Sequence, residues 1–100
     1  MKKKSILFFM LASSCIMAAS GQHIYKKECA GCHGKKAEKK ALGRSKPIHG
    51  MPYKHIVAET HDYAKGTKKS PNIVKNAKKR FLRKYKQDEI EAVARYISNL

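Results

Sequence analysis

Acidic residues are scarce in this sequence. Seven Asp and Glu stand against 23 Lys and Arg, so the 100 residues have a formal net charge of +16. A charge this large on a small protein produces a strong positive field, which speeds its encounter with acidic surfaces. Nucleic acid would be the first candidate partner of a cytosolic protein. The N-terminal export pattern described below argues against nucleic acid and favours an acidic protein or an anionic membrane surface.

Strand patterns and long apolar runs are also missing. No segment alternates apolar and polar residues, and no internal repeat is visible. The longest apolar stretch, from Ile6 to about Met17, is too short to serve as a permanent membrane anchor. The sequence therefore predicts an all-α domain with no stable transmembrane anchor. Its charge is compatible with a peripheral position on a membrane.

Cysteine is scarce as well. The chain has three cysteines, and only Cys29 and Cys32 follow the N-terminal segment. A disulfide between residues three positions apart closes almost no loop, so it adds little stability. Once residues 1–20 are removed, roughly 80 residues remain, and an apolar core in a chain of that size gives only marginal stability. A bound cofactor is therefore expected to help hold the fold.

Residues 1–20 have the order of an export signal. Three lysines come first, the apolar run follows, and small residues end the segment. Ala18 and Ser20 occupy the two positions that a signal peptidase requires to be small, which predicts cleavage before Gly21. We therefore expect a signal peptide over 1–20 and a mature domain over 21–100.

Two alternatives to simple cleavage stay open. Cys15 follows Ala-Ser-Ser, a loose version of the box that precedes a lipidated cysteine, so a lipoprotein anchored through Cys15 is the first. The second is a buried N-terminal helix of a cytosolic domain.

Three helices are expected in the mature domain. Within residues 21–35, a short helix is expected to run into a turn and to be stopped by Gly34. The second helix spans 51–66, with Pro52 in its first turn and Gly66 at its end. The third, 87–100, has the clearest helical period, carried by Ile90, Val93, Ala94, Ile97 and Leu100. Residues 36–50 are predicted to be mostly loop, and 67–86 a basic connector with a helical piece near Phe81 and Leu82.

The segment ECAGCHG, residues 28–34, carries the chemistry. Two cysteines three positions apart on a helical turn place both sulfurs on one side. CxxCH is the attachment signature of c-type haem: the thiols add to the two vinyl groups of the porphyrin, and the imidazole binds the iron.

Two other uses of the same residues are less compatible with the sequence. A redox dithiol of the thioredoxin kind needs a low-pKa thiolate and a βαβ context, whereas no strand precedes Cys29 and Glu28 opposes thiolate formation. A zinc site needs further ligands. The available histidines, none of which shows a paired spacing, are His23, His49, His55 and His61.

The motif and two shorter matches resemble a known family. ECAGCHG near the mature N-terminus, YAKG at 63–66 and ARYI at 94–97 together are similar to the small periplasmic class I monohaem cytochromes c of the cytochrome c-553 type. The resemblance covers nearly the whole mature chain, and its specificity lies in CxxCH. It implies three or more helices wrapped around one covalent haem c.

The resemblance also implies roles for residues and for the protein. Cys29 and Cys32 would hold the haem, and His33 would be the proximal iron ligand. The protein would be a periplasmic electron carrier rather than an enzyme, since the haem supplies the chemistry.

The family's usual sixth ligand is missing. Between Gly66 and Leu100 there is no Met and no His, and Ile73 stands about where the Met is expected. The remaining candidates are Met51, His49, His55 and His61, or a connector lysine, which can bind iron only after losing its proton. An iron with no fixed sixth ligand would be open to small molecules. The alternative function is therefore a haem protein that binds a gas or reacts with peroxide at an open or exchangeable position.

Lysines are concentrated in two segments. Four follow the haem motif, Lys35, Lys36, Lys39 and Lys40. Others crowd the connector, among them Lys68, Lys69, Lys75, Lys78, Lys79 and Arg80. A positive collar around the haem edge would steer the protein toward an acidic reductase or terminal oxidase. A solvated basic face without a partner is equally compatible with the sequence.

Overall fold

The structure is a computed structural model that describes residues 20–40 and 47–100. Within these residues the chain forms helices and no strand. Residues 20–28 are helical, and α2 (Ala30–His33), α3 (Tyr53–Lys65), α4 (Asn72–Lys84) and α5 (Gln87–Ser98) follow. The expected all-α class is confirmed. Cys15 and, apart from Ser20, the expected signal peptide lie outside the described residues.

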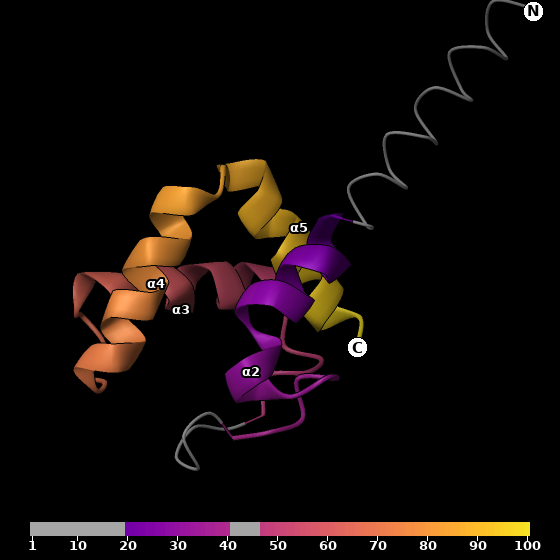
Figure 1. Ribbon diagram of the computed structural model, residues 1–100, viewed down its shortest axis with the longest axis horizontal. Coiled ribbons are helices and arrows are strands. Elements are labelled where there is room, and N and C mark those ends of the chain that lie inside the picture. The colour runs from indigo at the N-terminus through magenta and orange to yellow at the C-terminus, as the bar shows by residue number, and fades with distance from the viewer. Residues whose placement is uncertain (1–19, 41–46) are drawn as a thin grey trace, which may run out of the picture.

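The two ends of the domain pack against each other. Figure 1 shows the helix of residues 20–28 crossing α5, while α3 packs against both α4 and α5. At the crossing, a Cβ on Gly21 would lie 2.5 Å from the carbonyl oxygen of Ala92. Since no side chain fits in that space, glycine allows the two backbones to approach. The rings of Tyr25 and Tyr96 also meet there, with their centroids 5.5 Å apart.

The core lies between the crossing helices. Its buried cluster consists of Ile24, Tyr25, Ala37, Val93 and Ile97. Four of the five residues predicted to form the apolar stripe of the last helix are buried. The fifth, Leu100, is 37% exposed because α5 ends at Ser98, before the stripe reaches it.

The predicted middle helix is present and its end at Gly66 is confirmed, but it begins at Tyr53, so Pro52 lies before the first turn and not in it. Pro52 precedes α3, and Gly66 follows it with a φ of 84°, in the left-handed region that glycine adopts without strain. The Gly66 N–H donates to the carbonyl oxygen of Asp62 at 3.0 Å. At the start of α5, the Glu89 carboxylate accepts a hydrogen bond from the Lys86 N–H at 2.9 Å. This bond satisfies a donor that a helix start leaves without a partner.

The connector predicted over 67–86 is largely a helix. It contains α4, thirteen residues long, where the sequence indicates only a helical piece near Phe81. Val74, Ala77 and Phe81 follow helical spacing, and all three are partly buried. The many lysines of this segment hide that short stripe, and packing against α3 stabilises it.

In the described part of the chain, no helix is long and apolar enough to cross a membrane.

Candidate cofactor site

The CxxCH segment continues the helix of residues 20–28. The Cys29 N–H donates to the Tyr25 carbonyl oxygen at 2.9 Å, and the His33 N–H donates to the Cys29 carbonyl oxygen at 3.0 Å. Because residues four apart lie on one face of a helix, Cys29 and His33 face the same way. Cys32 is exposed on the same turn. Neither cysteine forms a disulfide.

A buried tyrosine fixes the end of this turn. The Tyr25 hydroxyl donates to the Gly34 carbonyl oxygen at 2.5 Å. Burial is the main cause that raises the pKa of Tyr25 to about 12, so the hydroxyl stays protonated and remains a donor. Beyond Gly34 the chain folds back, and the N–H groups of Ile48 and His49 both donate to the Ala37 carbonyl oxygen. The turn is thus held from both sides.

Cys29 and His33 lie in the wall of one pocket. About 550 Å³ of space lies between its side chains, part of it open to solvent. The wall comes from every described helix and is mostly apolar, with Ile48, Ile56, Val57, Ala77, Phe81, Ile90, Val93, Ala94 and Ile97. Such a wall excludes water and suits a large apolar group.

The His33 imidazole is available as a metal ligand. Its Nδ1 is buried and has no hydrogen-bond partner among the described residues. Burial, with a smaller contribution from the charge of Lys78, lowers the pKa of His33 to about 4. The ring is therefore neutral near pH 7, and a neutral imidazole is the form that binds iron.

The environment of Cys29 disfavours a redox dithiol. Burial is the largest effect on this thiol and raises its pKa to about 11. A reactive dithiol requires the opposite shift, because the thiolate is the nucleophile. The zinc alternative finds no support either, since no group of three His, Cys, Asp or Glu within 20–40 and 47–100 could hold a metal ion.

These residues fit a covalent haem. The turn supplies two thiols and a neutral imidazole, and the pocket beside Cys29 and His33 supplies an apolar wall. An unpartnered buried imidazole nitrogen is costly without a bonding partner, and ligation to iron would provide one.

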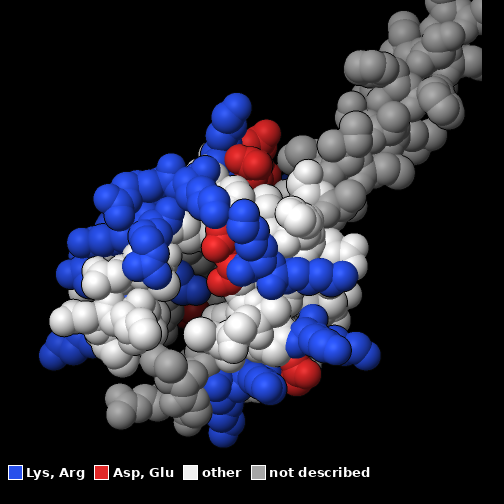
Figure 2. All heavy atoms as spheres, in the orientation of Figure 1, with Lys and Arg blue, Asp and Glu red and all other residues white. Residues whose placement is uncertain are grey.

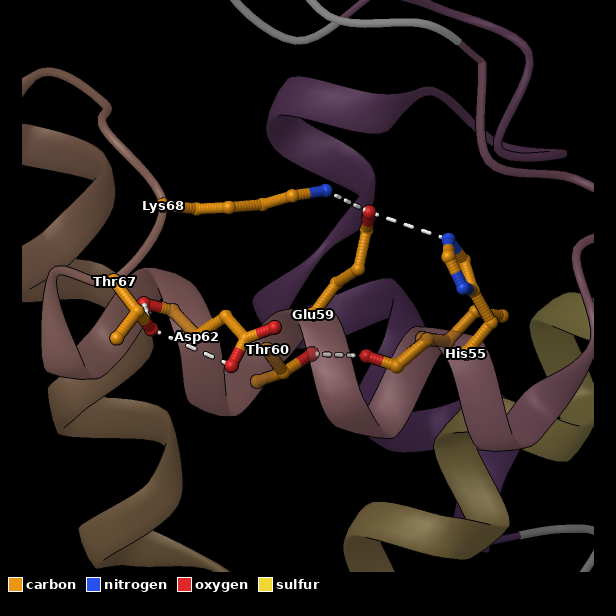
Figure 3. Close-up of polar contacts among 7 residues, drawn as sticks. His55, Glu59, Thr60, Asp62, Thr67 and Lys68 are labelled. Atoms are coloured by element: carbon orange, nitrogen blue, oxygen red, sulfur yellow. Dashed lines mark hydrogen bonds and ion pairs between the residues drawn. The ribbon is translucent and has the colours of Figure 1, made fainter.

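The four residues that the sequence analysis names as sixth-ligand candidates are absent from the described pocket wall. They are Met51, His49, His55 and His61. Met51 lies partly buried in the loop before α3, and His49 is exposed in the same loop. His61 on α3 is outside the wall, and Ile73 is 65% exposed near the start of α4. His55 lies 3.2 Å from Glu59, which also pairs with Lys68 (Figure 3). His23 lines a separate, shallow hollow.

Sequence reasoning missed the contribution of Ala77 and Lys78 on α4 to the wall. Ala77, Lys78 and Phe81 all line the pocket from this helix. Their spacing of one, three and four residues indicates one helical face. Lys78 lies on that face between the apolar residues Ala77 and Phe81. This arrangement is the sequence signal that could have identified it as a pocket residue.

Basic side chains gather over α4 on one face of the molecule. Figure 2 shows Lys and Arg crowded over α4 and beside the hollow at the centre of this face. The basic residues of α4 are Lys75, Lys78, Lys79, Arg80, Arg83 and Lys84. Lys84 pairs with Glu28 at 3.0 Å. Most of the others have no acidic partner in the described segments, so this face is strongly positive.

Comparison with known proteins gives consistent matches. The model of the cytochrome c family matches residues 18–100. The chain is 36% identical over 100 residues to cytochrome c-553 of Helicobacter pylori (strain J99 / ATCC 700824). The alignment covers 100% of this chain and 99% of that protein. Cytochrome c-553 of Helicobacter pylori (strain ATCC 700392 / 26695) gives the same identity and coverage. Cytochrome c-553 of Nitratidesulfovibrio vulgaris (strain DSM 19637 / Miyazaki F) is 31% identical over 87 residues, covering 87% of this chain and 82% of that protein.

Proposed function

The chain belongs to the cytochrome c family, and from that premise we propose that it is an exported electron carrier of the cytochrome c-553 type. The resemblance seen in the sequence is confirmed, and with it a covalently bound haem c as the cofactor. The observation that carries the proposal is the apolar pocket whose wall joins the first cysteine and the histidine of CxxCH.

The residues of the turn have separate roles in this proposal. Cys29 and Cys32 form the thioether bonds, and His33 is the proximal iron ligand. When bound, the haem accepts and releases one electron at its iron. The apolar side chains of α3, α4 and α5 exclude water from the pocket. A low-dielectric wall is one of the means by which a protein sets a haem potential.

The proposed location rests on the N-terminal segment. We assign residues 1–20 to a signal peptide and 21–100 to the cytochrome c domain, which places the mature protein in the periplasm. The lysines, apolar run and small residues support this assignment. Mass spectrometry of the mature N-terminus tests it: a chain starting at Gly21 is expected, whereas a lipidated Cys15 would identify a lipoprotein.

The proposed partners are acidic redox proteins such as a reductase or a terminal oxidase. The net charge of the mature chain, +16 less the three lysines of the signal peptide, or +13, and the basic face over α4 support this choice. We assign no catalytic residues, because the function requires only that the pocket hold the haem and that partners reach its edge.

A second candidate function follows from the sixth ligand. No Met, and no His besides His33, is found in the described pocket wall. An iron with a free or displaceable sixth position could bind a gas or react with peroxide. The axial ligation decides between this function and simple electron transfer.

The decisive experiment is expression of the full chain together with a cytochrome c maturation system. After denaturation the protein should retain its haem. Its mass should exceed that of the polypeptide alone by the mass of one haem group. Cys29→Ser and Cys32→Ser should each give a holoprotein with a single thioether bond, and the visible α absorption band of the reduced haem should shift from its wild-type wavelength. The double variant should release its haem on denaturation. Wild-type protein without covalent haem would refute the proposal.

A further inference from the structure

The pocket wall holds few atoms that could bind a metal. Of its fourteen residues, only Glu28, Cys29, His33, Thr60 and Lys78 carry a nitrogen, oxygen or sulfur in the side chain. The proposed function uses Cys29 for attachment and His33 as the proximal ligand. Three candidates therefore remain for the sixth position.

Two of these three side chains are already engaged. The Glu28 carboxylate accepts a hydrogen bond from the Tyr85 hydroxyl at 2.6 Å and lies 3.0 Å from the Lys84 amine. The Thr60 hydroxyl donates to the Ile56 carbonyl oxygen of its own helix at 2.8 Å. A neutral hydroxyl is also a weak ligand compared with the nitrogen and sulfur donors that hold haem iron.

Lys78 is the remaining candidate. It is partly buried on α4, between Ala77 and Phe81 in the pocket wall, and has no hydrogen bond or ion pair within the described segments. Burial dominates the pKa values of both Cys29 and His33. Lys78 lines the same pocket as Cys29 and His33, and its charge is the next contribution, which lowers the pKa of both.

We propose that the amine of Lys78 is the sixth ligand of the haem iron. This inference rests on the proposed function, because it requires the haem to be bound through Cys29, Cys32 and His33. On ligation the ammonium group gives its proton to solvent, and the freed lone pair of the nitrogen binds the iron. A flexible lysine stem gives the amine the reach to leave and rebind.

The assignment accounts for two features of the chain. Ile73, which stands about where the family's usual Met is expected, lies in α4 and is 65% exposed, so this segment offers the iron no ligand at that position. The ligand set becomes two nitrogens, which differ from a Met sulfur in the potential they give the iron. An amine that can dissociate would also make the sixth position exchangeable.

The test uses holoprotein purified with its haem attached, in the wild type and in Lys78→Ala, Lys78→Arg and Lys79→Ala. The wild type should be low-spin in the ferric absorption and electron paramagnetic resonance spectra. Lys78→Ala and Lys78→Arg should both become high-spin, since a guanidinium keeps the charge but cannot give up its proton. Lys79→Ala removes an exposed neighbour outside the pocket and should stay low-spin.

Carbon monoxide binding to the reduced protein is the second measurement. If the amine occupies the iron nine-tenths of the time, its removal should tighten the apparent affinity about tenfold. A high-spin wild type, or a low-spin spectrum unchanged in Lys78→Ala and Lys78→Arg, would overturn the assignment. In either case retained covalent haem leaves the proposed function standing, whereas wild-type protein without covalent haem overturns both. If Lys78→Ala fails to fold, Lys78→Arg gives the answer.

Discussion

The Tyr25 hydroxyl donates a 2.5 Å hydrogen bond to the carbonyl oxygen of Gly34, nine residues further along the chain. The two residues lie on either side of the turn that carries Cys29 and His33. Tyr25 is fully buried, and its ring also contacts that of Tyr96. One side chain therefore connects the N-terminal helix, the cofactor turn and α5.

Tyr25→Phe should destabilise the holoprotein. The substitution keeps the ring but leaves the buried Gly34 carbonyl without its donor, which costs about 1–3 kcal/mol. Denaturant unfolding measures the loss. Tyr96→Phe is the matched control, because the Tyr96 hydroxyl donates no hydrogen bond within the described residues. Equal effects of the two substitutions would contradict the role given to the hydroxyl.

Glu28→Gln should lower stability in a pH-dependent way. The hydrogen bond from Tyr85, followed by Lys84, lowers the pKa of Glu28 below its ordinary 4.5. A lowered folded pKa adds stability above the unfolded pKa and loses it as pH falls through the folded value. The variant should therefore be less stable than wild type near pH 7, and the difference should vanish below the folded pKa.

Unfolding measured from pH 7 to pH 3 checks the Glu28 prediction. Glu91→Gln serves as the control, since Glu91 makes no ion pair with the described residues. A stability gap for Glu28→Gln that persists at low pH would point to a packing effect instead of charge.

Gly66→Ala should destabilise the protein by about 1–2 kcal/mol, because its φ of 84° is strained for residues with a Cβ. The added Cβ would also lie 3.1 Å from the Lys75 amine, a flexible group that can move away. Gly31→Ala is the comparison, since its Cβ would meet nothing within 4 Å. Thermal unfolding of both variants gives the answer, and a Gly66→Ala variant as stable as Gly31→Ala would count against a strained position.

Met51→Ala should leave the haem spectra unchanged. Met51 lies in the loop before α3 and outside the described pocket wall. The wild-type ferric protein should accordingly lack the weak red-region band that marks a Met-ligated haem. A band that is present in the wild type and disappears in Met51→Ala would make Met51 the sixth ligand.

Electron exchange with an acidic partner should slow as salt is added. Removal of Lys2, Lys3 and Lys4 with the signal peptide lowers the net charge from +16 to +13, which still steers the encounter. Raising ionic strength from about 0.01 M to 0.15 M shortens the screening length from about 30 Å to about 8 Å. Stopped-flow rates with an acidic redox protein should fall by about tenfold or more. An uncharged reductant is the control, and an equal fall for both would exclude steering.

Much of the helical frame could be predicted from local sequence. Pro52 and Gly66 enclose the middle helix, and the apolar period of 87–100 identifies the last one. These signals are readable because each lies within one or two turns of the element it defines. The CxxCH motif is equally local, and its residue types and spacing alone indicate a covalent cofactor.

The sixth position could not be predicted in the same way. It depends on which faces of α3 and α4 turn toward the pocket, and that is decided by packing between segments distant in the sequence. Met51 and His55 were reasonable candidates by residue type, yet neither lies in the pocket wall. In the sequence Lys78 is one of many lysines, and only the packing of α4 places it in the wall between Ala77 and Phe81.

The backbone hydrogen bonds that run from Tyr25 through Cys29 to His33 make the cofactor turn a continuation of the helix of residues 20–28. In a continuous helix the direction of each side chain depends on its distance in sequence from a fixed residue, here Tyr25. Inserting a single residue between Tyr25 and Cys29 would rotate the thiol and the imidazole together by about 100°. Both would then turn away from the pocket, although every residue of CxxCH would still be present. The orientation of the motif about the helix axis, relative to Tyr25, is thus as necessary to the site as the identity of its residues.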